Sequence, residues 1–137
     1  MNIKLVNCSG TSLIELMGTI LVFMIGISAV LGVFYASGTM AKRAQYAYNA
    51  YNIAKNHIED LKAFSFSDLA VANETASAVD QNGVDDTTGQ YIRTTTITTS
   101  YNSNSNLTEV DVKVWYVLRG VQSQNPMQLT TVVSQNG

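Results

Sequence analysis

The first side chain that could do chemistry is a lone carboxylate at the start of a long apolar segment. Glu15 is followed by residues 16–41, which carry no charged side chain. An ionised carboxylate among apolar groups is unfavourable unless a cation pairs with it, so Glu15 is a candidate charge-pairing residue. Residues 12–15, Ser-Leu-Ile-Glu, also fit a capping box, in which a carboxylate suits the positive end of a helix. The two roles are compatible, because capping within one molecule does not prevent pairing with another.

Two further groups of polar side chains have simpler explanations than catalysis. His57 has no matching cysteine, histidine or nucleophile, so we expect it at a solvated position on a helix. The run from Asp80 to Asp86, DQNGVDD, is rich in oxygen ligands, but Gly83 stands two places too early for an EF-hand loop. We favour an ordinary turn-rich loop there, with calcium binding as the alternative. Because the chain also lacks a nucleophile-base set and a phosphate-cradling glycine loop, we expect no enzymatic activity, no cofactor and no metal site.

The composition limits the classes of protein that remain. The chain has 137 residues, of which 13% are charged, and its formal net charge is -2. It has room for one small domain, and it lacks the basic field through which proteins bind nucleic-acid phosphates. Cys8 is the only cysteine, so neither an intrachain disulfide nor a paired-cysteine metal site is possible.

The uncharged segment is long enough to cross a bilayer. Its roughly 26 residues would give a helix of about 39 Å, whereas the hydrocarbon core is roughly 30 Å thick. A secretory signal peptide has a shorter apolar core and a small residue after it, but here Gly10 precedes the core. Residues 1–10 are expected to be a short cytoplasmic leader. The count of basic residues favours the opposite orientation, with residues 1–10 outside the cytoplasm, because only Lys4 precedes the segment and both Lys42 and Arg43 follow it.

Periodicity predicts that one helix, from about Ser12 to about Phe64, continues beyond the apolar segment. Apolar residues recur at spacings of three and four on one face, and the opposite face is polar. The expected apolar face comprises Ala44, Ala47, Tyr51, Ala54, Ile58 and Leu61. Helical packing and the aromatic belt of a membrane surface explain Tyr46, Tyr48 and Tyr51 without invoking stacking on nucleic-acid bases.

Beta structure is predicted in the last third of the chain. Residues 65–89 lose periodicity and are expected to form a loop, with a short helical turn near Asp68 to Ala72. Residues 91–101, 107–118 and 127–134 predict three antiparallel strands. Such a sheet cannot cover its own apolar face, so the helix is the expected cover. The predicted fold class is α+β, with one long N-terminal helix packed through its C-terminal half on about three to four strands.

The start of the apolar segment resembles the processing site of type IV prepilins. In that family a glycine ends a leader and is followed by a residue that is often Phe, then by Thr or Ser, Leu, Ile and Glu. The matching residues are Gly10, Ser12, Leu13, Ile14, Glu15 and Leu16, whereas Thr11 replaces the usual Phe. Residues 50–64 are similar to the segment after the membrane helix in PilV-type minor pilins and GspI-type minor pseudopilins. That likeness is carried by Ala54, Asn56, Ile58, Glu59 and Leu61.

The resemblance implies a pilin-like fold and a structural role. A prepilin peptidase would cut between Gly10 and Thr11 and methylate the new amine of Thr11, and Glu15 would pair with such an amine on a neighbouring subunit. The implied partners are that peptidase, other pilins or pseudopilins and, before assembly, inner-membrane lipid. The implied segments are a leader (1–10), a transmembrane and filament-core helix (11–41) and a periplasmic head (42–137).

Several alternatives stay open at this stage. The resemblance does not choose among a pilus for adhesion or motility, a type II secretion pseudopilus and a DNA-uptake system. Gly32 stands where major pilins commonly have proline, which mildly favours a minor subunit. The alternative from a different class is a single-pass membrane-anchored binding module that forms no filament.

Overall fold

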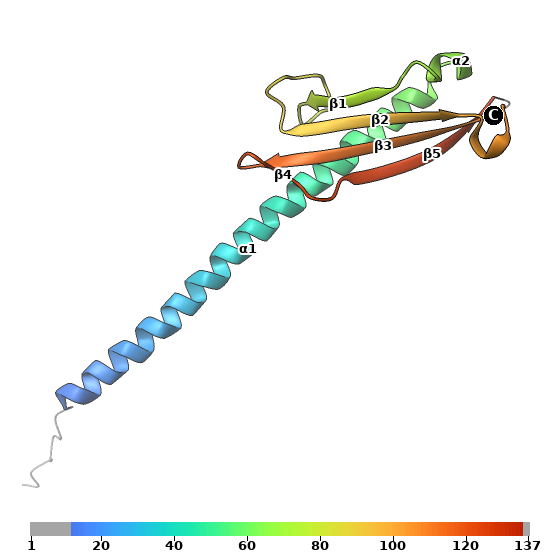
Figure 1. Ribbon diagram of the computed structural model, residues 1–137. Helices are drawn as coiled ribbons and strands as arrows, with labels where there is room; N and C mark the ends of the chain where they lie inside the picture. Colours follow the sequence, from blue (N-terminus) through green and yellow to red (C-terminus); the bar gives the residue numbers. More distant parts are fainter. Residues whose placement is uncertain (1–11, 136–137) are drawn as a thin grey trace, which may run out of the picture. The chain divides into compact units, whose positions relative to one another are not determined.

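A computed structural model of the chain describes residues 12–135 (Figure 1). The chain divides into two compact units at the boundary between Ala41 and Lys42, and helix α1, Leu13–Lys62, contributes to both. The predicted bounds of this helix, about Ser12 to about Phe64, agree with the observed ones to within two residues. At its end, the backbone N–H groups of Ala63 and Phe64 bond three residues back, to Asp60 and Leu61, which tightens the last turn.

In the first unit, α1 exposes apolar side chains on all sides. No residue in the most apolar stretch of the helix is buried, and the helix is long and apolar enough to cross a membrane. Hydroxyl groups on this surface bond back to the helix itself, Thr19 Oγ1 to the carbonyl of Leu16 and Ser28 Oγ to that of Met24, each at 2.8 Å. These hydroxyls therefore add little free hydrogen-bonding capacity to the apolar surface.

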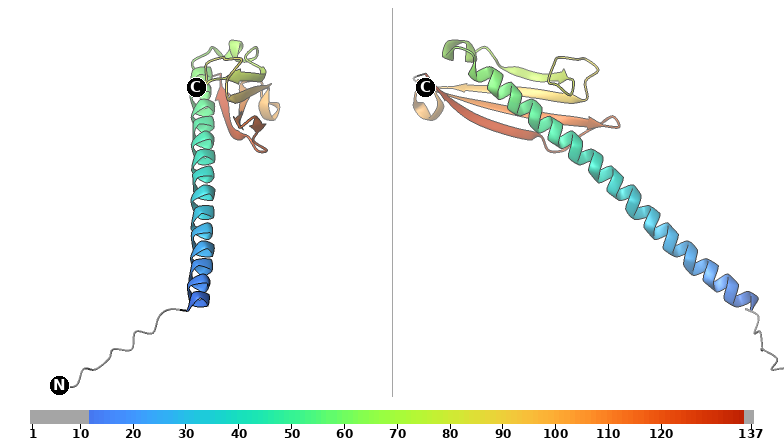
Figure 2. Two further views of the ribbon diagram at one scale, coloured as in Figure 1. Left: turned by 90° about the vertical axis from the view of Figure 1, so that its left-hand side faces the viewer. Right: turned by 180° about the vertical axis from the view of Figure 1, so that it is seen from behind.

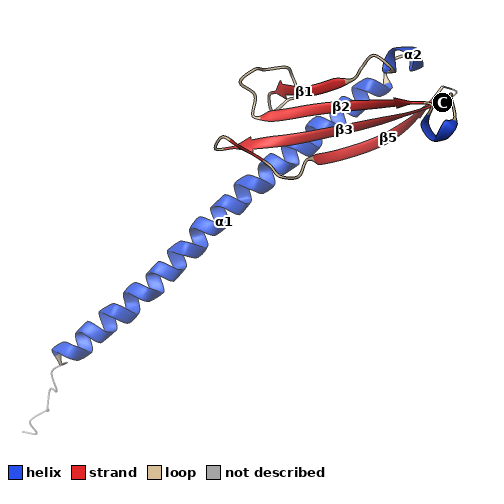
Figure 3. Ribbon diagram, in the orientation of Figure 1, coloured by secondary structure: helices blue, strands red, loops and turns tan. Residues whose placement is uncertain are grey.

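The second unit, called the head below, is α+β and pilin-like in layout, with α1 packed on a curled antiparallel sheet (Figure 3). The strands are β1 Glu74–Val79, β2 Tyr91–Thr99, β3 Leu107–Leu118, β4 Val121–Gln122 and β5 Met127–Ser134. The strand order is β1-β2-β3, and both β4 and β5 pair with the edge of β3 that lies opposite β2. The three predicted strands are confirmed, although β2 ends two residues early, before the 3-10 turn Tyr101–Ser103.

The core of the head lies between one face of the sheet and one face of α1 (Figure 2). Strict alternation along β3 buries Val110, Val112 and Val114 against the helix, as predicted. The buried face of α1 consists of Ala50, Ile53, Ala54, Ile58 and Leu61.

The predicted apolar face of α1 is correct toward the end of the helix and wrong toward its middle. Tyr51 is 44% exposed and Ala44 is also exposed, whereas Ala50 and Ile53 are buried. The small side chain of Ala50 lets the sheet approach closely, and the neighbouring Tyr46 supplies the bulk by packing on Tyr91 and Tyr116. In this part of the head, the buried face of α1 therefore runs through Ala50 and Ile53 and not through Tyr51.

The prediction of a continuous loop over residues 65–89 is wrong in one respect, because it contains strand β1. Ala76 has a φ of +49° and the pairing with β2 shifts register between Glu74 and Ser77, so the strand lacks the alternation that would have marked it. The predicted helical turn also lies earlier, at α2 Phe66–Leu69. Ser65 caps α2 by accepting a hydrogen bond from the backbone N–H of Asp68.

Candidate functional site

Glu15 lies in the first turn of α1, as predicted for a residue at the start of the apolar helix. The carbonyl of Ser12 accepts hydrogen bonds from the backbone N–H groups of Glu15 at 2.9 Å and Leu16 at 3.1 Å, which opens the helix. The adjacent motif residues Leu13 and Ile14 are 76% and 75% exposed. The predicted processing residues, Gly10 and Thr11, lie outside the residues that the structure describes.

A shallow hollow adjoins Glu15 on the surface of α1. It is lined by Glu15, Gly18, Thr19, Val22 and Phe23, and a Cβ atom on Gly18 would meet nothing within 4 Å. Because glycine has no side chain, Gly18 leaves space on the helix surface about one turn from the carboxylate of Glu15. The carboxylate is therefore open to a group supplied by another molecule.

In the head, a buried arginine joins strand β1 to the loop that follows it. Arg93 on β2 is 8% exposed, and its Nε and Nη2 donate to the two oxygens of Glu74 at 2.6 and 2.8 Å. Its Nη1 donates to the carbonyl of Gly83 at 2.8 Å, and Nη2 lies 3.4 Å from Oδ1 of Asp85. The bidentate pair of Arg93 with Glu74 has the geometry in which arginine binds a carboxylate most strongly.

His57 adjoins this ion pair, so the prediction of a solvated helix position is wrong. Its side chain is 18% exposed, and its Nε2 lies 3.8 Å from Oε2 of Glu74. Within the part of the chain that the structure describes, this Nε2 is buried without a hydrogen-bond partner. The helix register explains the burial, because His57 lies one turn from both Ile53 and Leu61 on the face that meets the sheet.

The surroundings of His57 favour its neutral form. Burial and then the charge of Arg93 lower the pKa of His57, and the opposing charges of Glu74, Asp60 and Asp85 do not compensate. The pKa of Glu74 is also lowered. Burial alone would raise it, but the hydrogen bond and the charge of Arg93 outweigh that effect.

We expect the head to lose stability as the pH falls from 7 to 5, and His57 to be the cause. The unfolded chain takes up a proton near a pKa of about 6.5, whereas the folded head resists protonation of His57, so acid favours unfolding. Thermal unfolding of the full chain and of His57→Gln, measured at several pH values, should show a flatter pH dependence in the variant over this range. His57 is the only histidine in the chain. Equal slopes for the two proteins would contradict the assignment.

Below about pH 4.3 both proteins should lose stability together. Glu74 keeps its lowered pKa in the folded state, so its contribution is present above the pKa of an unfolded glutamate and disappears as the pH falls further. This second decline is the internal control for the first, because the change at His57 leaves the pair between Glu74 and Arg93 in place.

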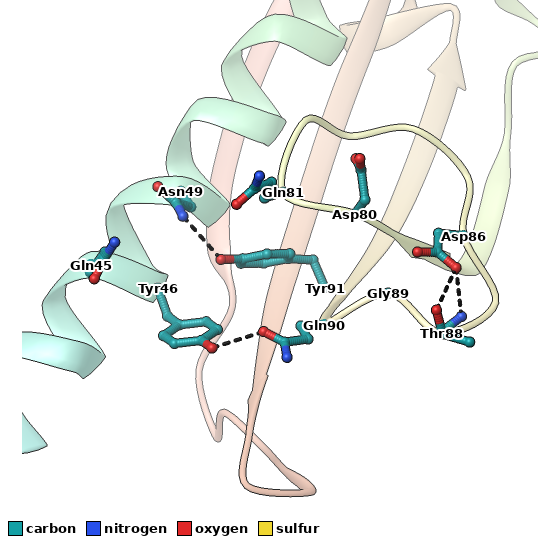
Figure 4. A pocket seen from close by; sticks show the side chains of 10 residues that line it. All are labelled: Gln45, Tyr46, Asn49, Asp80, Gln81, Asp86, Thr88, Gly89, Gln90 and Tyr91. Atoms are coloured by element: carbon teal, nitrogen blue, oxygen red, sulfur yellow. Dashed lines mark hydrogen bonds between the residues drawn. The ribbon is translucent and has the colours of Figure 1, made fainter.

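A polar pocket of about 370 Å³ lies beside the same loop, between α1 and residues 80–91 (Figure 4). α1 contributes Gln45, Tyr46 and Asn49. The Tyr46 hydroxyl donates to Oε1 of Gln90 at 2.8 Å, and Nδ2 of Asn49 donates to the Tyr91 hydroxyl at 3.2 Å. These bonds connect the helix to the start of β2 across the pocket.

The predicted packing role of the tyrosines holds for Tyr46 within the head. Its ring centroid lies 5.9 Å from that of Tyr91 and 6.1 Å from that of Tyr116, within the range of aromatic contacts. Tyr48 and Tyr51 are 65% and 44% exposed instead. Of these three tyrosines, only Tyr46 packs its ring against the core.

The carboxylates of residues 80–86 organise the loop. Oδ1 of Asp80 accepts the backbone N–H groups of Val84 at 2.9 Å and Asn82 at 2.8 Å, and these bonds, that of Val84 most, lower the pKa of Asp80. Oδ1 of Asp86 accepts both the backbone N–H and the hydroxyl of Thr88. Over residues 12–135, no three histidine, cysteine or acidic side chains gather as a metal site would require.

No family model, curated protein or solved structure matches this chain. Two features of the chain itself point to a function: the exposed apolar half of α1 with Glu15 in its first turn, and the polar surface of the head around residues 80–91.

The Arg93 cluster, consisting of Arg93, Glu74, His57 and Asp85, was missed by sequence reasoning. One signal could have revealed it. Side chains alternate between the two faces of a strand, so Arg93 lies on the same face as Tyr91 and Thr95. If Tyr91 faces inward, Arg93 does too, and a buried arginine needs a carboxylate partner. The identity of that carboxylate could not be read from the sequence, because Glu74 lies on the strand that was not predicted.

Proposed function

We propose that this protein is a minor pilin-like or pseudopilin-like structural subunit that assembles through the apolar half of α1. The observation that carries the proposal is a helix with apolar side chains exposed on every side and one carboxylate in its first turn. The same helix continues into the head, where its other half is packed on a small sheet. In this role residues 1–10 are a leader, 11–41 anchor the precursor in the bacterial inner membrane, and 42–137 form a periplasmic head.

The proposed mechanism is extraction from lipid followed by docking against other subunits. Apolar helices leave the bilayer and pack on one another, which replaces lipid contacts by closer protein contacts. The carboxylate of Glu15 then pairs with the N-methylated amine of Thr11 on a neighbouring subunit, and the hollow beside Gly18 provides room for that amine. Because an unpaired charge is disfavoured in an apolar bundle, the pairing fixes the axial register of the subunits.

A single-pass membrane-anchored binding module is the second candidate, favoured by the polar pocket of the head. An anchor of this kind needs the apolar helix and has no use for a carboxylate in its first turn. The two candidates therefore differ in what they require of residues 10–15.

The intact mass of the mature protein tests the proposal. In cells with an active prepilin peptidase, we expect a product that begins at Thr11, lacks residues 1–10 and carries one added methyl group. Gly10→Val should leave the full precursor, because a branched side chain replaces the residue that ends the leader. Gly18→Ala is the matched control and should be processed normally, since a Cβ atom there meets nothing within 4 Å. A wild-type protein that retains its leader in such cells would overturn the proposal.

A further inference from the structure

We propose that the pocket between α1 and residues 80–91 binds a neutral saccharide. The inference concerns the head alone and does not depend on filament assembly. The pocket is about 370 Å³ in volume, within the range of roughly 300 to 1,000 Å³ that small-molecule sites occupy. It is bounded by amide, carboxylate and tyrosine side chains from two parts of the chain (Figure 4).

The charges around the pocket disfavour an anionic ligand. Asp80 and Asp86 both line it, and no lysine, arginine or histidine is among its lining residues. Backbone N–H groups of the loop lower the pKa of Asp80, so this carboxylate is ionised at neutral pH. A phosphate or a carboxylated ligand would therefore be repelled.

A metal cation is disfavoured for a different reason. Oδ1 of Asp80 already accepts two backbone N–H groups and its Oδ2 accepts Nδ2 of Asn82, while Oδ1 of Asp86 is occupied by Thr88. Calcium requires about six to eight oxygen ligands, and Oδ2 of Asp86 is the one carboxylate oxygen of this lining without a hydrogen bond among the described residues. The pocket thus offers too few free anionic oxygens for such an ion.

The hydrogen-bonding groups that remain match hydroxyl groups. Across residues 12–135, the side-chain amides of Gln45 and Gln81 have no hydrogen-bond partner, and Gln90 uses only its Oε1, on Tyr46. Oδ2 of Asp86 is also free, and the Tyr91 hydroxyl, which accepts from Asn49, retains its own hydrogen to donate. A sugar hydroxyl donates and accepts at once, so this mixture of amide donors, amide acceptors and a carboxylate suits a polyhydroxylated ligand.

The ring of Tyr46 supplies the other surface that a sugar needs. Tyr46 lines the pocket and is half-buried, and its ring is tilted by 31° against the buried ring of Tyr91 at a centroid separation of 5.9 Å. A pyranose has one face of C–H groups, which packs on an aromatic ring while its hydroxyls reach the polar rim. The hydrogen bonds of both tyrosine hydroxyls fix these rings in place before any ligand arrives.

Binding can be measured by NMR on the isotopically labelled full chain in micelles of a sugar-free detergent. The probes are glucose, galactose and N-acetylglucosamine, each at millimolar concentration. We expect at least one of them to shift the signals of Gln45, Gln81 and Gln90 in a saturable way. Gln45→Ala and Gln81→Ala should each weaken that binding by about fivefold, because each removes one hydrogen-bonding group that the fold does not use.

Gln124→Ala is the matched control. It removes an exposed glutamine outside this pocket and should leave the affinity unchanged. Three results would overturn the proposal: no saturable shift with any of the three sugars, binding that neither pocket variant weakens, or shifts at these residues only with calcium chloride or inorganic phosphate. Unchanged signals elsewhere in the head would establish that the variants are folded.

Discussion

Replacing Glu15 by leucine is expected to abolish incorporation of the protein into filaments while leaving it in the membrane. The substitution removes the one carboxylate in the apolar half of α1, so insertion should be unchanged or improved. Assembly should fall at least roughly tenfold, because each subunit loses a charge-assisted contact with its neighbour. The ratio of sheared filament to membrane-bound protein, measured by immunoblotting in a host with the assembly machinery, reports both effects.

Ser28→Leu provides the matched control for this experiment. Ser28 lies in the apolar half of α1 outside the hollow beside Glu15, and its hydroxyl is bonded to the carbonyl of Met24, so its replacement makes the helix more apolar without removing a charge. Glu15→Gln keeps the size of the side chain and removes its charge, and it should fail to assemble as Glu15→Leu does. Normal incorporation of Glu15→Leu would contradict the pairing mechanism, whereas absence of the wild-type protein from sheared filaments would favour the membrane-anchored binding module.

Replacing Arg93 by methionine is expected to destabilise the head severely. Arg93 is 8% exposed and bonds Glu74 with two N–H groups, so its loss leaves a largely buried carboxylate without a cation. Breaking a buried pair in this way costs about 3 kcal/mol. The carbonyl of Gly83 also loses its donor. For a domain of this size, the Tm measured on the full chain in detergent should fall by roughly 12 to 24 °C.

Arg119→Met controls for the chemistry of the substitution. Arg119 is exposed in the turn between β3 and β4, and its replacement should change the Tm little. Arg93→Lys should give an intermediate loss, because lysine keeps the charge and cannot form the two parallel hydrogen bonds to Glu74. If Arg93→Met unfolds at the temperature of Arg119→Met, the ion pair does not stabilise the head.

The elements that sequence reasoning found are those with strong periodicity. The run from Val110 to Val114 alternates strictly, and its inward side chains are buried as that pattern requires. The segment of β1 contains small residues and a bulge at Ala76, so it carries no such pattern. Pairing with β2 and the bond between Glu74 and Arg93 hold it in place, and both depend on residues far along the chain.

The candidate sites were predictable to different degrees. Glu15 could be found because a charge in an apolar run is visible in the sequence itself. His57 was placed wrongly, because helical spacing gives the neighbours of a residue on its own helix and says nothing of the strand that covers it. The pocket could not be predicted, since only the fold brings Gln45 and Gln81 to the same pocket and neither belongs to a recognisable pattern.

The place of β3 in the sheet determines when the head can form during synthesis. β3 is the strand that joins β2 to β5, and most of the buried valines belong to it, yet it begins only at Leu107. A ribosome finishes the apolar half of α1 and the whole helical face of the core long before it reaches that residue. Until β3 is synthesised, the apolar face of the amphipathic half of α1 lacks the strand that buries it.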